Sequence, residues 1–131
     1  MDEVLEFLRK VRTFYLATID GCRPRVRPFG AVTAFGGKIY LVTENGKKVF
    51  KQIMDNPKIE ICGMTPEFEW IRVEAEAVLD DNREVRAKML EDNPELKDMY
   101  TPDDGNMVVL YLKDAKATFE SYTEKPRTVE F

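Results

Sequence analysis

Histidine is absent from this chain of 131 residues. Its absence excludes histidine general bases, Ser-His and Cys-His nucleophile pairs, most catalytic zinc sites and histidine-ligated haem. Cysteine is scarce, and the two that occur, Cys22 and Cys62, lie far apart and in no paired motif. This spacing argues against a zinc site or a dithiol redox centre. Any chemistry must therefore come from lysine, arginine, tyrosine, carboxylates or a borrowed cofactor.

Long apolar runs and a positive charge excess are also missing. No apolar run approaches the roughly 20 residues of a membrane-spanning helix, and Met1-Asp2-Glu3 lacks the basic start of a secretory signal. We therefore expect a cytoplasmic protein that makes no membrane contact. The net charge of −4 is unlike the basic excess of nucleic-acid-binding domains, so a small barrel for single-stranded nucleic acid is disfavoured.

The hydrophobic pattern predicts a mainly β protein that forms one domain over residues 1–131, since the length and the 44% hydrophobic share suit a single core. The expected strands are 13–19, 25–35, 38–43, 58–64, 68–79, 107–112 and 116–122. We expect the last two to form a hairpin around Asp114-Ala115. Short turns favour antiparallel pairing, and closure removes exposed edges. A small antiparallel β-barrel with peripheral helices satisfies both conditions.

Helix-start motifs predict where the peripheral helices lie. We expect a first helix capped by Asp2, a second over 49–54, a third opened by the capping box Asp81–Glu84, and a short helical segment after Asn93-Pro94. The polar tail 123–131 ends in apolar residues that either dock or fray.

Two expected strands have informative faces. In 25–35, Arg25, Arg27 and Phe29 share one face, and Pro28 cannot donate to a sheet ladder, so this strand lies at an edge or is bulged. In 68–79, alternate residues from Ile71 to Leu79 are expected in the core. The opposite face mixes Phe68 and Trp70 with charged residues. That face suits a partner chain or a ligand at one end, and an ordinary solvent face is the alternative.

The stretch Thr43–Lys48 joins a strand to a helix and carries an unusual charge pattern. Asn45 is expected to cap the helix, which places Lys47 and Lys48 in its first turn. The helix dipole disfavours cations there by ~0.3–1 kcal/mol each. A bound anion would reverse this effect, because backbone N–H groups and both ammonium groups would converge on it. The alternative is solvated surface lysines partly compensated by Glu44.

Several other residues are candidates for the same anion. Arginine supplies planar paired donors, lysine a point charge and threonine a hydroxyl, so these types together favour a phosphate site. The candidates are Arg25, Arg27, Thr43, Lys47 and Lys48. A salt-bridged, solvated strand edge is the competing interpretation. Asp103 and Asp104 are adjacent acids in a loop, where a solvated turn is favoured over a metal site, and no metal is expected.

The order of these residues resembles a known family. Arg25-Val26-Arg27-Pro28-Phe29, then Gly37–Thr43, then Lys47–Ile53 with Asn56-Pro57, is similar to the pyridoxamine 5′-phosphate oxidase-like, FMN-binding split-barrel proteins. The narrower similarity is to short bacterial members related to general stress and nitroimidazole-resistance proteins. It continues through Trp70–Ala77 and covers nearly the whole chain, although 25–57 is its specific part.

The resemblance implies a split barrel and a homodimer with two FMN sites at the subunit interface. It places Arg27 at the flavin phosphate ahead of Arg25, Thr43 and Lys48 at the helix start, and Lys47 as a second cation. Trp70 would lie near the interface, by the partner's flavin, and Gln52 matches a structural helix position. The implied cofactor contacts are Arg25, Val26, Arg27, Pro28, Phe29, Thr43, Lys47, Lys48 and Trp70.

The expected function is that of an FMN-binding flavoprotein, an oxidoreductase or reductase acting on an unknown small molecule. A deazaflavin is the less favoured cofactor, and no catalytic residue is assigned. A non-catalytic flavin or phosphorylated-ligand binding protein, with a stress-related role, is the alternative. The chain shows no counterpart to the basic and aromatic C-terminal segment of true pyridoxamine-phosphate oxidases, so that activity is not expected.

Overall fold

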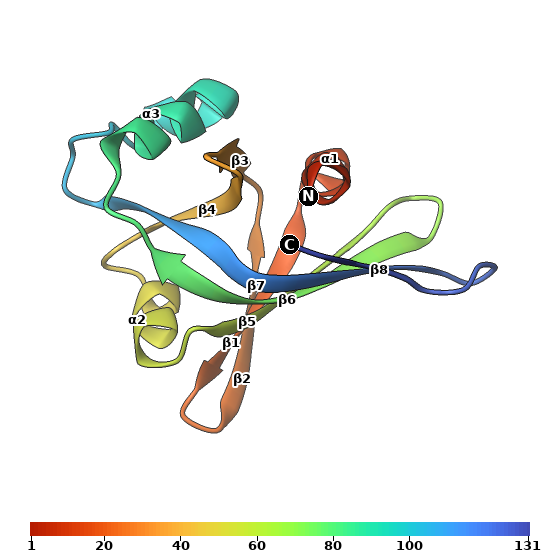
Figure 1. Ribbon diagram of the computed structural model, residues 1–131. Coiled ribbons are helices and arrows are strands. Elements are labelled where there is room, and N and C mark those ends of the chain that lie inside the picture. The colour runs from red at the N-terminus through yellow and green to blue at the C-terminus, as the bar shows by residue number, and fades with distance from the viewer.

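The computed structural model describes the whole chain, Met1–Phe131. It contains eight strands, three α-helices and one 3₁₀ helix (Figure 1). The strands are β1 Phe14–Asp20, β2 Arg23–Phe29, β3 Val32–Phe35, β4 Lys38–Glu44, β5 Lys58–Met64, β6 Glu69–Leu79, β7 Met107–Ser121 and β8 Arg127–Glu130. The helices are α1 Asp2–Val11, α2 Lys48–Asp55, α3 Arg83–Asp92 and the 3₁₀ helix η1 Pro94–Asp98. No helix has the length and apolar character needed to cross a bilayer.

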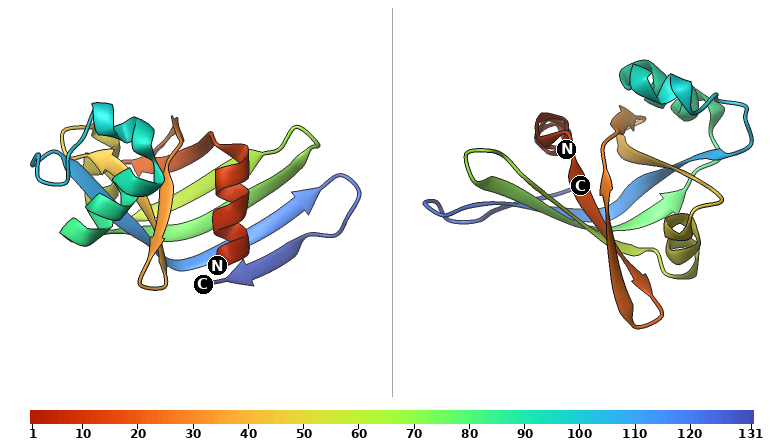
Figure 2. Two further views of the ribbon diagram at one scale, coloured as in Figure 1. Left: turned by 90° about the horizontal axis from the view of Figure 1, so that it is seen from above. Right: turned by 180° about the vertical axis from the view of Figure 1, so that it is seen from behind.

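All strands pair antiparallel in the order β2-β1-β5-β6-β7-β4-β3, with β8 added beside β7. β2 and β3 follow each other in sequence but lie at opposite ends of this order, so the two residues Gly30-Ala31 carry the chain from one edge to the other. The sheet curves to allow this passage, which confirms the predicted mainly β split barrel (Figure 2). β2 pairs only with β1, as expected for an edge strand that contains Pro28.

The main core fills the concave side of the sheet, and α1 lies across it (Figure 2). α1 contributes Val4, Leu5 and Leu8, which fall on one helical face. Gly63 on β5 allows the helix end to approach, because a Cβ there would lie 3.0 Å from Val11 Cγ2. The sheet contributes alternate inward residues, among them Leu16, Ile39, Leu41, Ile61, Ile71 and Val73.

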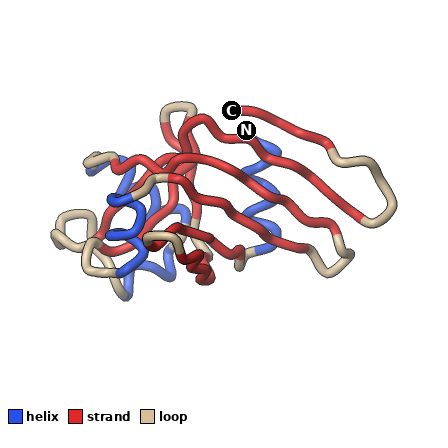
Figure 3. The backbone as a smooth tube through the Cα atoms, turned by 90° about the horizontal axis from the view of Figure 1, so that it is seen from below, coloured by secondary structure: helices blue, strands red, loops and turns tan.

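A second core lies where α3 and η1 pack on the other face of β4 and the start of β7. Tyr40 and Val42 from β4 meet Val85 and Met89 from α3, and Leu96 and Tyr100 complete the cluster. Helices α2 and α3 gather at one end of the molecule, while the β5–β6 and β7–β8 turns project at the other (Figure 3). This second core fixes η1 beside β4. The stretch Thr43–Lys48, the predicted anion-binding motif, begins at the end of that strand.

Two strand predictions are wrong. The strand expected over 25–35 is broken at Gly30-Ala31, because the chain must change sheet edges there. The hairpin expected around Asp114-Ala115 is a bulge within one long strand, β7. Glu74 pairs with Lys116 and Glu76 with Lys113, so β7 holds one extra residue, and Asp114 takes a positive φ of 51°.

The tail docks and does not fray. β8 pairs with β7, and Phe131 exchanges two 2.9 Å backbone hydrogen bonds with Ala115. Leu79, expected in the core, is 41% exposed at the end of β6.

Helix starts also differ in detail from expectation. Asp2 lies inside α1 behind Met1, and Lys47 is the N-cap residue of α2 in place of Asn45. Asn45 instead donates from Nδ2 to the Gly105 carbonyl, 2.8 Å away, and thereby ties the β4–α2 turn to the loop before β7. Asn82 caps α3 by accepting from the Glu84 and Val85 N–H groups, so Asp81 stands outside the cap.

Asp92, at the end of α3, holds that helix to its neighbours. Its carboxylate accepts from the Thr33 hydroxyl and the Lys88 ammonium, and Arg9 of α1 lies 3.4 Å away. Burial acts to raise the pKa of Asp92, but the hydrogen bonds from Lys88 and Thr33 and the charges of Lys88 and Arg9 outweigh it. The pKa therefore lies below its usual value.

We predict that Asp92→Asn lowers the free energy of unfolding at pH 7 by about 1–2 kcal/mol, because the charge-assisted contacts are lost. The pKa of this carboxyl is lower in the folded state than in the unfolded state, where it is about 4. The carboxylate therefore contributes its full stabilisation above the unfolded-state pKa, and this stabilisation is lost as the pH falls through the folded-state pKa. The difference in free energy of unfolding between wild type and Asp92→Asn should therefore become smaller toward pH 3 in denaturant titrations. Asp98→Asn, at an exposed residue without hydrogen-bond partners, is the control. Equal stability of Asp92→Asn and wild type at pH 7 would contradict this role.

Candidate functional site

Two adjoining clefts lie between the edge strand β2 and the β4–α2 turn. The first, which we call the basic cleft, has a volume of about 700 Å³. It is lined by five cationic residues and by two carboxylates that pair with Arg25 and Lys51, and its charged residues are Arg25, Arg27, Lys47, Lys48, Lys51, Asp20 and Asp55. The second, the apolar cleft, has a volume of about 370 Å³ and is lined by Pro28, Phe29, Val42, Leu96, Met99 and Tyr100, among others. Arg27, Lys47 and Val49 belong to both, so the two clefts are neighbours.

Arg27 is held at this junction by neutral partners only. Its Nη1 donates to the Thr18 hydroxyl at 2.7 Å and to the Leu16 carbonyl at 3.2 Å, and its Nη2 donates to Gln52 Oε1 at 2.7 Å. The Thr18 hydroxyl donates in turn to the same Gln52 oxygen at 2.6 Å. Burial and then the charge of Arg25 lower the pKa of Arg27. The result is a half-buried cation that is oriented by dipoles and has no counter-ion.

Lys47 and Lys48 stand at the N-terminus of α2, as predicted, and neither forms an ion pair. No acidic residue lies in the first turn of this helix. Both lysines are exposed, and Glu44, whose carboxylate accepts from the Tyr100 hydroxyl at 2.9 Å, forms no ion pair with either of them. The N–H groups of Lys48 and Val49 make no hydrogen bond within the chain. Backbone donors and ammonium groups are thus left unpartnered at one place.

Thr43 is positioned by β4, the strand that leads into this turn. It pairs with Val108 of β7 and is 3% exposed, yet its hydroxyl makes no hydrogen bond within the chain. It lines the apolar cleft together with Arg27 and Lys47. A hydroxyl that lines the cleft without a partner in the chain can donate to an anionic oxygen without further rearrangement.

Most of the predicted site residues are brought together. Arg25 and Val26 line the basic cleft, and Pro28 and Phe29 line the apolar cleft, all from β2. Arg25 is partly neutralised, since its Nε lies 3.1 Å from the Asp20 carboxylate. Of the two arginines, Arg27 is therefore the one whose charge has no carboxylate partner within the chain.

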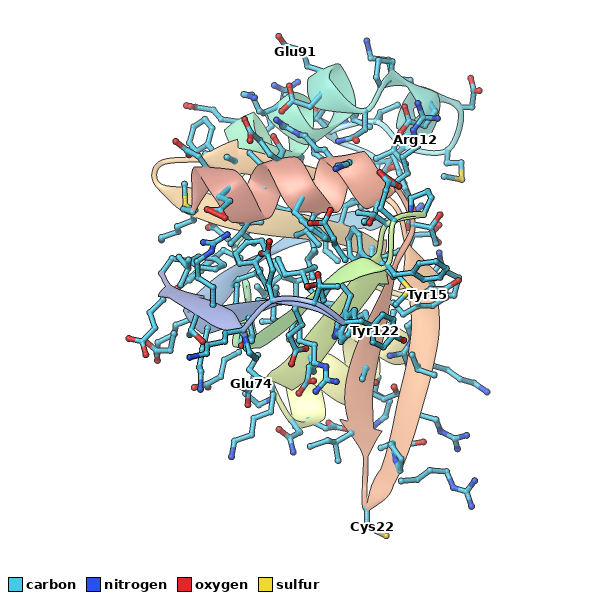
Figure 4. All side chains as sticks on the ribbon, turned by 90° about the vertical axis from the view of Figure 1, so that its right-hand side faces the viewer. Arg12, Tyr15, Cys22, Glu74, Glu91 and Tyr122 are labelled. Atoms are coloured by element: carbon cyan, nitrogen blue, oxygen red, sulfur yellow. The ribbon has the colours of Figure 1, made fainter.

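Trp70 is the predicted residue that joins neither cleft. It lies on β6, where its Nε1 donates to Glu120 Oε2 at 2.7 Å and its ring centroid is 5.1 Å from that of Tyr122. Phe68 and Tyr122 are 60% and 78% exposed beside it. Tyr15 and Tyr122 lie on the same outer side of the sheet (Figure 4). This aromatic face remains the one on which a partner chain is expected.

The two acids considered for a metal site make structural contacts within the chain. Asp103 receives a two-pronged contact from Arg83, and the Asp104 carboxylate accepts from the N–H groups of Thr101, Asn106 and Met107. No group of three ligating side chains that could hold a metal occurs in the structure. Cys22 sits at the tip of the β1–β2 hairpin (Figure 4), and Cys62 lies on the outer face of β5; both thiols are free and exposed.

Sequence reasoning missed most of the residues that support the site from a distance. Thr18 and Gln52 orient Arg27; the resemblance named Gln52 only as a structural helix position, and the only sequence signal for Thr18 is a hydroxyl at an inward strand position. Tyr100 closes the apolar cleft through its bond to Glu44, 56 residues earlier. Burial, followed by the hydrogen bond to Glu44, raises the pKa of Tyr100 to about 12. No local pattern reveals contacts across such separations.

The chain is similar to several solved structures. A NimC/NimA family protein from Clostridium acetobutylicum is 47% identical, with a TM-score of 0.97, over 100% of this chain and 92% of that one. General stress protein 26 from Bacillus anthracis is 20% identical, with a TM-score of 0.79, over 99% and 97%. A pyridoxamine 5′-phosphate oxidase-related, FMN-binding protein from Nostoc punctiforme is 14% identical, with a TM-score of 0.62, over 99% and 95%. The last two show the fold alone.

Two further comparisons differ in outcome. No curated protein sequence matches this chain significantly. The family described as pyridoxamine 5′-phosphate oxidase matches residues 1–119, which is most of the chain. The match runs through every strand of the split barrel except β8, together with both sides of the two clefts. The protein is therefore a member of the pyridoxamine 5′-phosphate oxidase family.

Proposed function

We propose that this protein binds FMN and acts as a flavin-dependent oxidoreductase on a small molecule. The FMN phosphate would occupy the basic cleft against Arg27, Lys47 and Lys48, with Thr43 as a hydroxyl donor. The flavin ring would follow β2 through Pro28 and Phe29 into the apolar cleft. The observation that carries this proposal is the convergence of three cations that have no carboxylate partner within the chain.

Electrostatics supports a phosphate in preference to a weaker anion. A half-buried guanidinium without a counter-ion lowers the stability of the empty site, and a dianion would relieve it. The free N–H groups at the start of α2 and the helix dipole act in the same direction. Charge-assisted hydrogen bonds of this kind are about twice as strong as neutral ones.

When bound, the flavin supplies the hydride and electron chemistry. The chain's own residues would bind the phosphate, orient the ring and exclude water from its apolar side. Among the residues named for the apolar cleft, Tyr100 stays protonated at neutral pH and donates to Glu44, so it is not a general base. No catalytic side chain is assigned for this reason.

A homodimer is part of the proposal. The exposed aromatic face around Trp70, Phe68 and Tyr122 is the surface that a second copy would cover. The cytoplasm is the proposed compartment, since both cysteines are free thiols in this fold.

A non-catalytic flavin or phosphorylated-ligand binding protein is the second candidate, and the lack of an assigned acid or base in the apolar cleft favours it. Purified protein that is yellow but is not reduced by nicotinamide donors would support this candidate over an enzyme. The mass of the released chromophore separates FMN from a deazaflavin.

We predict that Lys48→Glu weakens FMN binding roughly 10- to 100-fold, because one charge-assisted contact is replaced by repulsion. The measurement is titration of the apoprotein with FMN, followed by flavin fluorescence. Lys97→Glu makes the same charge change at an exposed lysine outside both clefts and should bind as wild type does. Unchanged FMN affinity of Lys48→Glu, with its thermal unfolding intact, would reject the assigned phosphate site.

We further predict that Gln52→Glu weakens FMN binding by about tenfold or more. The substitution keeps the shape of the side chain and gives Arg27 a carboxylate partner at the position of Gln52 Oε1, so the site no longer needs an external anion. The apoprotein should be as stable as wild type or more stable in denaturant titrations. Gln52→Met, which removes the acceptor without adding charge, should instead lower stability and affect FMN binding less. Tighter FMN binding by Gln52→Glu would show that Arg27 does not meet the phosphate.

A further inference from the structure

The short segment Pro94–Tyr100 forms the wall of the apolar cleft that faces β2. One apolar residue of this segment is exposed although its neighbours pack in the core. Leu96 and Tyr100 are buried in the second core, whereas Met99 between them is 63% exposed. Met99 lines the apolar cleft together with Phe29 of β2. A large apolar side chain left uncovered in a concave apolar site is typical of ligand-binding surfaces.

The segment is anchored at both ends, so the position of Met99 is set by the fold. Before it, the Asn93 side-chain amide donates to the Val32 carbonyl on β3 at 3.1 Å and to the Met89 carbonyl at 3.0 Å. After it, the Tyr100 hydroxyl binds Glu44 at the end of β4. Both edges of the wall are thereby tied to the sheet that carries the site. The exposed side chains that this segment places in the cleft are Glu95 and Met99, and Met99 is the apolar one.

Three charged residues line the apolar cleft. Arg27 and Lys47 are shared with the basic cleft. Glu95 lies on the Pro94–Tyr100 wall itself and also lines a neighbouring depression. Apart from Glu95, the wall and the strands that face it offer apolar side chains, among them Phe29, Val42 and Met99. An anionic substrate would be repelled by Glu95 and would lose hydration against these apolar side chains.

We propose that Met99 and the Pro94–Tyr100 wall form the substrate side of the site and select planar molecules that carry no negative charge. The inference rests on the proposed function, since a flavin ring that follows β2 would leave this wall facing it. Methionine suits the role because its thioether is polarizable, makes favourable contacts with aromatic rings and repacks around different shapes. Met99 is a specificity-determining residue and takes no part in electron transfer.

The test uses the wild-type protein loaded with FMN and labelled with methyl-¹³C methionine. The chain has six methionines, and the Met99 signal is identified by its loss in Met99→Leu. Addition of benzamide, an uncharged planar probe, should shift the Met99 methyl signal in a saturable way. Met54 and Met64, which are 43% and 46% exposed and line none of the clefts described, should not move and serve as internal controls. Absence of a Met99 shift, or equal shifts at all three, would overturn the inference.

Charge and size are tested with a second probe and a second variant. Benzoate, the same ring with a negative charge, should bind at least several-fold more weakly than benzamide, and equal binding would refute selection against anions. Met99→Ala should weaken benzamide binding roughly 2- to 10-fold, and more than it weakens FMN binding, because FMN is also held through its phosphate. If Met99→Ala loses FMN as Lys48→Glu is predicted to, Met99 belongs to the cofactor site and the inference is wrong. If wild type fails to bind FMN at all, the proposed function fails instead, which keeps the two outcomes separate.

Discussion

The guanidinium of Arg27, held on neutral oxygens at the meeting of β2, β1 and α2, is the contact on which the site depends. Thr18 and Leu16 from β1 and Gln52 from α2 fix its orientation but leave its charge uncompensated. A carboxylate in place of any of these partners would satisfy the arginine and close the site to an external anion. Because the partners are dipoles, the fold orients the cation and keeps its charge available for a ligand.

The barrel topology explains how the remaining ligands reach that cation. Gly30-Ala31 carries the chain between opposite edges of the sheet, so β2 remains an edge strand with one side unpaired. β4 then ends beside it, and the turn after β4 opens α2 with two lysines. The Glu44–Tyr100 bond ties this turn to the wall of the apolar cleft, and the Asn45–Gly105 bond ties it to the loop before β7. The basic cleft and the apolar cleft are therefore built on one connected frame.

The sequence predicts the parts of this arrangement that depend on local patterns. Strict alternation identifies β5 and β6, and the strand–turn–lysine order identifies the anion motif and the family. Sequence reasoning fails where partners that are distant in the chain decide the conformation. Asp114 resembles a turn residue but adopts a bulge, because β6 runs unbroken beside it. Asn45 is a favourable cap residue, yet its side-chain amide donates to the carbonyl of Gly105, sixty residues later. The partners of Arg27 and the exposure of Met99 are likewise set by packing that no local pattern records.

The central claim is that a phosphate group, not the flavin ring, supplies most of the specificity at the basic cleft. Calorimetric titration of the wild-type apoprotein with FMN and with riboflavin, which lacks the phosphate, tests it most directly. The account predicts that FMN binds about 100-fold more tightly or better, and that this advantage shrinks as salt screens the site. Equal affinities for FMN and riboflavin would contradict it.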